Sequence, residues 1–150
     1  IHLHNVFGFF LKITRDEMVA EDLSQDVFMK LYKNLKNFRH ESSFSTYLYR
    51  INMNTANTWI TRNKWKNILH IDQIPDRGEI DRTNEEEWKR KELWDGISKL
   101  PKKQRTVVML RISDSLSYKE ISDITGMSKG SAKVNYHHAI KRLKEILDDA

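Results

Sequence analysis

The chain has 150 residues, 39% of them hydrophobic, and a formal net charge of +5. This length suits one compact domain or two small helical units that would each be only marginally stable alone. Cysteine is absent, which excludes disulfides and thiolate zinc sites. No apolar run approaches the length of a membrane span and no signal peptide is recognisable, so we expect a cytoplasmic protein with no membrane insertion. Because the sequence starts without Met on an apolar helical pattern, we expect that a segment precedes it.

Charge is distributed in blocks along the chain. With Lys and Arg counted against Asp and Glu, residues 1–35 sum to −1, residues 36–66 to +5, residues 67–100 to −3 and residues 101–150 to +4. Two basic blocks separated by an acidic one indicate two surfaces that each meet a polyanion, joined by a connector that does not. Such blocks can equally be solvated faces.

The first half of the chain predicts two helices. Apolar residues at spacings of three and four predict the buried stripe of the first helix. This stripe comprises Ala20, Leu23, Val27, Leu31 and Leu35, widened by Phe28 and Tyr32. A second helix is expected from about residue 45 to residue 64, with Leu48, Ile51 and Thr55 facing inward. The polar segment 38–44 (FRHESSF) between them is expected to be a tight loop.

Periodicity fades between residues 68 and 86, where Pro75 and Gly78 occur among several aspartates, a composition typical of a linker. About 20 extended residues span at most roughly 70 Å. At about 3.4 Å per base step this corresponds to some 20 base pairs. The linker could therefore hold two DNA-binding modules on separated elements of one site.

The second module is predicted to begin with a helix that ends before Pro101 and carries Trp88, Leu93, Ile97 and Leu100 on one face. A helix over residues 102–113 follows, with Val107 and Leu110 in the core. Residues 117–120 (SYKE) have the form of a capping box, which opens a short helix containing Ile121 and Ile124. Gly126 is a favoured left-handed residue for its C-terminal end, and Ser128 is the expected N-cap of a last, longer helix.

A short capped helix, a glycine-containing turn and a longer basic helix form the layout of a helix-turn-helix, in which the first helix braces the second across the major groove. In the last helix the expected inward stripe is Ala132, Tyr136, Ala139, Leu143 and Leu147, and the opposite face carries Lys129, Lys133, Val134, His137 and Lys141. No acid occurs between Lys129 and Lys144, which suits phosphates and base edges. An ordinary helical hairpin with a solvated basic face is the alternative. His137 and His138 lack acidic or thiol neighbours, so we predict no metal site.

The first basic block interleaves aromatic residues with cations and amides: Phe44, Tyr47, Tyr49, Trp59 and Trp65 with Arg39, Arg50, Arg62, Lys64, Asn52, Asn54 and Asn57. Aromatic rings stack on unpaired bases and amides read exposed base edges. Aromatic residues in a helix are also common core residues, and the sequence leaves open which of these face DNA. Phe44 and Trp59 are the two that we expect to be buried.

These residues resemble a known family. Residues 22–28 (DLSQDVF), Phe38-Arg39, residues 43–51 (SFSTYLYRI) and Asn54-Thr55-Ala56 resemble region 2 of the sigma-70 family, most closely its extracytoplasmic-function group. Residues 100–110 (LPKKQRTVVML) and the helix-turn-helix resemble region 4 of that group. The resemblance implies an all-α fold of two small domains, region 2 over residues 1–66 and region 4 over residues 88–150, joined by a flexible linker over residues 67–87.

The resemblance also implies a division of labour between surfaces. Asp22, Gln25, Asp26 and Phe28 would dock on core RNA polymerase, in which the largest and second-largest subunits are the expected partners. Arg39, Ser42, Ser43, Phe44, Tyr47, Arg50 and Asn54 would open and read the −10 promoter element. Lys129, Ser131, Lys133, Val134 and His137 would contact the −35 element. The family also implies an anti-sigma factor as a further partner.

Two other classes of function remain possible from the sequence. One is a helix-turn-helix regulator that binds duplex DNA without polymerase, and the other is a sigma-like decoy or adaptor that occupies polymerase without reading promoters. An enzyme is not expected, because no Gly-rich phosphate loop, nucleophile elbow or metal-ligand cluster is present, and no cofactor is predicted.

Overall fold

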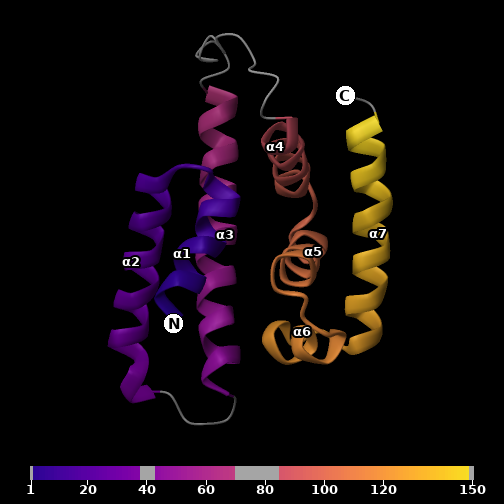
Figure 1. Cartoon of the computed structure of the whole chain (residues 1–150). Helices are drawn as coiled ribbons and strands as arrows, with labels where there is room; N and C mark the ends of the chain where they lie inside the picture. The colour runs from indigo at the N-terminus through magenta and orange to yellow at the C-terminus, as the bar shows by residue number, and fades with distance from the viewer. Residues whose placement is uncertain (1, 38–42, 70–84, 149–150) are drawn as a thin grey trace.

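A computed structural model describes residues 2–37, 43–69 and 85–148 of the chain, and these residues form α-helices and one short 3-10 turn, with no strand among them (Figure 1). The elements are α1 (His2–Thr14), α2 (Glu17–Asn34), η1 (Leu35–Asn37), α3 (Phe44–Leu69), α4 (Glu85–Ser98), α5 (Lys102–Asp114), α6 (Tyr118–Thr125) and α7 (Lys129–Asp148). The all-α prediction is confirmed. Helices α1 to α3 make one unit and helices α4 to α7 a second (Figure 1).

The first unit is built on the apolar face of α1. Val6, Phe9 and Phe10 are buried, and the rings of Phe9 and Phe10 meet edge to face with their centroids 5.2 Å apart. This face packs on α2 and α3, and α2 contributes Ala20 and Val27 as predicted. The resulting three-helix bundle holds the long helix α3 against α2.

The predicted stripe of α2 is wrong at its C-terminal end. Tyr32 is 83% exposed and Leu35 53% exposed. Successive residues of a helix turn by 100°, so Tyr32 lies about 120° around α2 from Ala20 and misses the buried face. Leu35 falls in the 3-10 turn η1, whose tighter winding takes it off the α-helical stripe. The two side chains are therefore available to a partner.

The second unit is centred on α5. All six residues from Arg105 to Leu110 are buried, because α5 lies between α7 on one side and α3 on the other, with α4 and α6 at its ends. Val107 and Leu110 are in the core as predicted, and Thr106, Val108 and Met109 are buried as well. The central turns of α5 are therefore covered from more than one side.

The two units are in contact. Helix α3 packs along α5 and α6, so that the buried residues of both units form one continuous cluster (Figure 1). Helix α3 continues to Leu69 and α4 begins at Glu85. Most of the predicted linker therefore lies outside the described residues. The sequence did not predict that the units dock on each other.

Candidate polymerase and nucleic-acid interfaces

The first candidate surface is the outward face of α2. Asp16 caps this helix, and its Oδ1 accepts hydrogen bonds from two backbone N–H groups of the first turn at 2.9 and 3.3 Å. Of the residues predicted to bind polymerase, Asp22, Gln25 and Asp26 are exposed and Phe28 is half-buried against the core. The carboxylates and the amide are thus presented together on one helix face.

Apolar side chains extend this surface in a way the sequence analysis missed. Met18, Met29 and Tyr32 are 77%, 58% and 83% exposed. A shallow groove on α2 is lined by Gln25, Phe28, Met29, Tyr32 and Lys33. Aromatic residues and Met are enriched in protein–protein interfaces, and clustered exposed apolar residues mark such sites. The exposed apolar surface of α2 could have been predicted from the position of Tyr32 on the helical wheel, which lies outside the core stripe.

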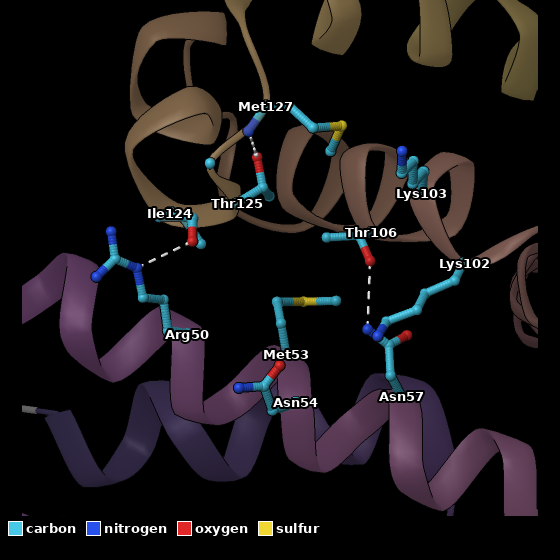
Figure 2. A pocket seen from close by; sticks show the side chains of 11 residues that line it. Arg50, Met53, Asn54, Asn57, Lys102, Lys103, Thr106, Ile124, Thr125 and Met127 are labelled. Atoms are coloured by element: carbon cyan, nitrogen blue, oxygen red, sulfur yellow. Dashed lines mark hydrogen bonds between the residues drawn. The ribbon is translucent and has the colours of Figure 1, made fainter.

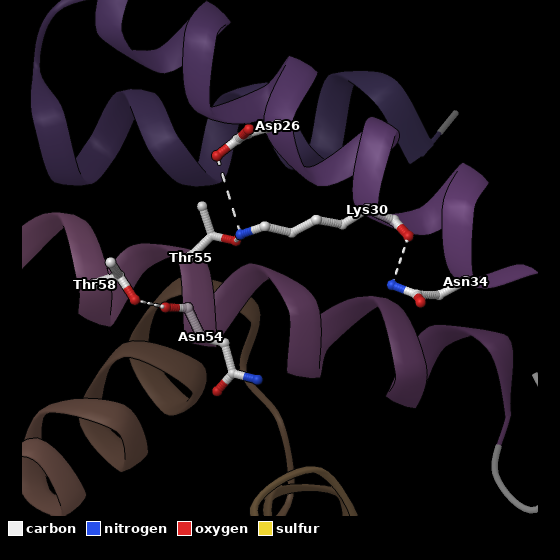
Figure 3. Close-up of polar contacts among 6 residues, drawn as sticks. All are labelled: Asp26, Lys30, Asn34, Asn54, Thr55 and Thr58. Carbon is white, nitrogen blue, oxygen red and sulfur yellow. Dashed lines mark hydrogen bonds and ion pairs between the residues drawn. The ribbon is translucent and has the colours of Figure 1, made fainter. Parts of the chain in front are cut away.

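Lys30 connects the α2 surface to α3 (Figure 3). Its Nζ donates to Thr55 Oγ1 at 3.1 Å and lies 4.0 Å from a carboxylate oxygen of Asp26. Thr55 is buried in α3, as predicted. The lysine side chain therefore lies between Asp26 and the helix behind it.

The second candidate surface is the first half of α3. Ser43 caps this helix: its Oγ accepts from the backbone N–H of Thr46 at 3.1 Å and lies 2.9 Å from the Thr46 hydroxyl. Phe44 and Tyr47 are half-buried, and Phe44 packs against the core, as Trp59 does further along. Asn54 is exposed. The predicted DNA-binding residues Arg39 and Ser42 lie outside the described residues.

A pocket of about 530 Å³ lies between α3 and the second unit (Figure 2). It is lined by Arg50, Met53, Asn54, Asn57, Lys102, Lys103, Thr106, Ile124, Thr125, Gly126 and Met127. Three of these are cationic and none is acidic. Arg50 donates from Nε to the carbonyl oxygen of Ile124 at 3.0 Å and from Nη2 to that of Asp123 at 2.6 Å. Two residues assigned to the −10 element, Arg50 and Asn54, thus face the second unit.

Tyr49 makes a further contact between the units. Its hydroxyl donates a hydrogen bond to the carboxylate of Asp114, at the C-terminal end of α5. Two effects raise the pKa of Tyr49 from 10.0 to about 12: burial, which is the larger, and the negative charge of Asp114. The phenol therefore stays neutral at physiological pH and acts as a hydrogen-bond donor.

The third candidate surface is the helix-turn-helix formed by α6 and α7. The predicted capping box is present: Ser117 Oγ accepts from Glu120 N, and Glu120 Oε1 accepts from Ser117 N, both at 3.1 Å. Gly126 ends α6 in the left-handed conformation with φ of 81°, as predicted. Ser128 Oγ accepts from Ser131 N at 3.0 Å and caps α7, which confirms the predicted N-cap.

The outward face of α7 is as the sequence predicted. Lys129, Lys133, Val134 and His137 are exposed and Ser131 is half-buried, whereas Ala132, Ala139 and Leu143 are buried. Residues 129–144 carry no carboxylate, so this face presents positive charge and short side chains near the start of the helix. That is the arrangement with which a recognition helix contacts phosphates and base edges in the major groove.

A cation between two aromatic rings fixes the angle of α7. The guanidinium carbon of Arg111 lies 4.4 Å from the ring centroid of Tyr118 and 5.6 Å from that of Tyr136. These three side chains come from α5, α6 and α7, and Arg111 also donates to the carbonyl of Leu116 at 3.0 Å. Cation–π contacts of this kind join the helices without an ion pair. The spacing of these three residues in the sequence does not predict that they form a cluster.

No group of residues suited to hold a metal ion occurs in the described part of the chain. Among the described helices, none is long and apolar enough to cross a membrane. The fold thus defines an all-helical protein of two units, the second of which carries a helix-turn-helix.

Comparison with known proteins identifies the family. Residues 1–66 match the model of sigma-70 region 2 and residues 90–143 that of sigma-70 region 4. An RNA polymerase sigma-E factor of Streptomyces avermitilis is 31% identical over 137 residues, which cover 91% of this chain and 75% of that protein. An ECF RNA polymerase sigma-E factor of Haemophilus influenzae is 33% identical over 141 residues, covering 85% of this chain and 72% of that protein.

The fold is also that of solved sigma factors. The sigma factor RpoE of Bartonella quintana, solved in complex with the anti-sigma factor NepR, superposes with a TM-score of 0.61 at 21% identity, covering 97% of this chain and 91% of that chain. The chain belongs to the sigma-70 family of RNA polymerase sigma factors, in the extracytoplasmic-function group.

Proposed function

We propose that this sigma factor docks on core RNA polymerase through the outward face of α2. The exposed residues Asp22, Gln25 and Asp26 and the neighbouring groove with Tyr32 support this assignment. Carboxylates beside exposed aromatic and Met side chains suit a protein partner rather than DNA, whose phosphates would be repelled. The partners are the largest and second-largest subunits of the cytoplasmic polymerase, which performs the chemistry, so no catalytic step belongs to this chain.

We further propose that α7 reads the −35 element and the first half of α3 the −10 element. The observation that carries the proposal is the acid-free face of α7, on which Lys133, Val134 and His137 are exposed. The resemblance to region 4 assigns these three residues to base edges. Phosphate contacts supply affinity and a few side chains supply sequence. On α3, the exposed amide of Asn54 is suited to the edge of an unpaired base.

The same proposal divides the chain into region 2 over residues 1–66, a connector over residues 67–87 and region 4 over residues 88–150.

The proposal also includes an anti-sigma factor as a partner. Support for that partner comes from the related RpoE structure, which is described as a complex with the anti-sigma factor NepR. The exposed groove on α2 and the open face of α7 are surfaces that such a partner would have to cover to block the factor.

The test is transcription by purified core polymerase on pooled genomic DNA of the source organism, with and without this protein. We expect discrete start sites that appear only with the protein, and their loss with Asn54→Ala or Lys133→Ala. Lys144→Ala is a matched control, because Lys144 is an exposed lysine three turns further along α7, away from the base-reading positions. Polymerase binding without start sites would point to a decoy, and tight duplex binding without polymerase binding to a free-standing regulator.

A further inference from the structure

A large apolar side chain of α7, that of Val134, points away from the core. Val134 is 52% exposed, whereas Ala132, Ala139 and Leu143 of the same helix are buried. At 100° per residue, each of these three buried residues lies about 140–180° around the helix from Val134. Val134 therefore occupies the centre of the outward face of α7, and this face lies at an edge of the molecule (Figure 1).

The neighbouring turn leaves the methyl groups of Val134 uncovered. Helical side chains lean toward the N-terminus and cover the residue one turn before them. For Val134 this residue is Gly130, which has no side chain, and a Cβ added there would meet no atom within 4 Å. Ser131, beside Gly130, is half-buried, and its Oγ accepts a hydrogen bond from Asn135 Nδ2 at 3.3 Å. A flat group that approaches this face of α7 can therefore reach both methyl groups of Val134.

Polar and cationic side chains flank Val134 on both sides. Lys133 and His137 are exposed on one side of it, about 100° and 60° around the helix, and His138 is exposed about 40° around on the other side. A patch that docks on another protein is expected to be apolar and depleted of charge at its centre. A single apolar side chain among hydrogen-bonding groups instead matches a surface that presents one methyl group among donors and acceptors.

The amide side chain of α7 is not part of this outward face. Asn135 is the one Asn or Gln of the helix. Its Nδ2 donates to the carbonyl oxygen of Ser131 at 2.9 Å and lies 3.8 Å from the sulfur of Met127. Asn and Gln are the side chains that read adenine by paired hydrogen bonds. Because this amide is held by its own helix and the preceding turn, α7 presents no adenine-reading amide to the groove.

The major groove of B-DNA presents one apolar group on its base edges, the C5-methyl group of thymine. We propose that Val134 reads the methyl group of a thymine in the −35 element. The inference rests on the proposed assignment of α7 to that element and deepens it by naming a base and the group of that base that is recognised. It follows that the −35 element contains a thymine, on one strand or the other, which faces the start of α7.

The expected strength of this contact follows from the apolar surface that it removes from water. Burial of one methyl-sized group corresponds to about a fourfold change in affinity. Val134 contributes nothing to the buried core, so a smaller or polar residue at this position creates no cavity. A change of binding in such a variant therefore reports on the contact with DNA and not on the fold.

Deoxyuridine provides the test, because it differs from thymidine only by the missing methyl group. Holoenzyme is assembled from core polymerase and the full chain, on a promoter found in the transcription experiment described above. Each thymine of the −35 element, on both strands, is replaced in turn by deoxyuridine, and affinity is measured by competition with the unmodified promoter. The parent is compared with Val134→Ser, which removes both methyl groups. Val134→Ile, which keeps a branched apolar side chain, is the matched control.

We expect the parent and Val134→Ile to lose about fourfold in affinity when one particular thymine is replaced. Val134→Ser should bind the thymine and deoxyuridine promoters equally well. A −35 element without thymine, a parent that is indifferent to deoxyuridine at every position, or equal losses in the parent and Val134→Ser would overturn the proposal.

Two further outcomes separate this proposal from other roles of α7. Weaker binding of Val134→Ser to core polymerase in the absence of DNA would overturn it, because Val134 would then belong to a protein interface. Absence of any start site with the parent would overturn the proposed function itself, on which the assignment of α7 depends.

Discussion

Gly126 offers a sharp test of the reasoning about the helix-turn-helix. It ends α6 with φ of 81° and ψ of −3°, and its N–H donates to the carbonyl of Ser122 at 2.9 Å. A Cβ added at Gly126 would meet no atom within 4 Å. The cost of Gly126→Ala is therefore conformational and not steric. The left-handed region costs an L-residue roughly 1–2 kcal/mol, so we expect the free energy of unfolding to fall by about that amount.

Gly130→Ala is the matched control. Gly130 lies in the first turn of α7, and a Cβ there would also meet nothing within 4 Å. Its backbone is helical, so Ala should raise the free energy of unfolding, by up to about 1 kcal/mol. Urea unfolding followed by circular dichroism measures both variants. A neutral or stabilising Gly126→Ala, or shifts of the same sign in both variants, would refute the argument that this turn needs a left-handed residue.

Three further predictions follow from the capping box, the interface and the α2 surface. Ser117→Ala should lower the free energy of unfolding by about 1 kcal/mol in urea titrations, because the hydrogen bond from Glu120 N to the Ser117 hydroxyl is lost; no change would contradict a role for the cap. Tyr49 ionises at pH 10.0 when unfolded and at about pH 12 when folded, so the unfolded chain loses this proton first and stability should fall as pH rises between these values. Tyr49→Phe should remove that part of the decline, and identical pH profiles would contradict the pKa shift. Tyr32→Ala should weaken binding to core polymerase by about tenfold or more, as for an aromatic interface anchor, at unchanged stability because this ring is exposed; unchanged affinity would remove Tyr32 from the docking surface.

Features that depend on residues a few positions apart follow from the sequence alone. The capping box joins residues 117 and 120, and Ser128 caps α7 by accepting from the backbone N–H three residues ahead. Gly126 adopts the left-handed conformation that ends α6. Each of these features depends on side-chain and backbone groups that are close in sequence, so it does not require the tertiary fold. The outward face of α7 is likewise fixed by helical periodicity, which separates Lys133 and His137 from Ala132 and Ala139.

Burial that depends on a second covering surface does not follow from periodicity. The pattern of α5 predicts one inward stripe with Val107 and Leu110, yet Val108 and Met109 are buried too. They are covered because α3 lies on the side of α5 that α7 leaves open. The opposite error occurs in α2, where Tyr32 is apolar enough for a core but is exposed because none of the described helices covers that side.

The sequence by itself determined most of the helices, the caps at Ser117 and Ser128, the helix-turn-helix and the family. Only the tertiary structure decided that the face of α3 with Arg50 and Asn57 is turned toward the second unit. Arg50 meets Asp123 over 73 positions, and Asn57 meets Arg105 over 48. Such contacts arise from the way two helical surfaces fit, and neither composition nor periodicity encodes that fit over such distances along the chain. The acidic connector predicts two modules, and the tertiary structure adds that the two modules pack against each other.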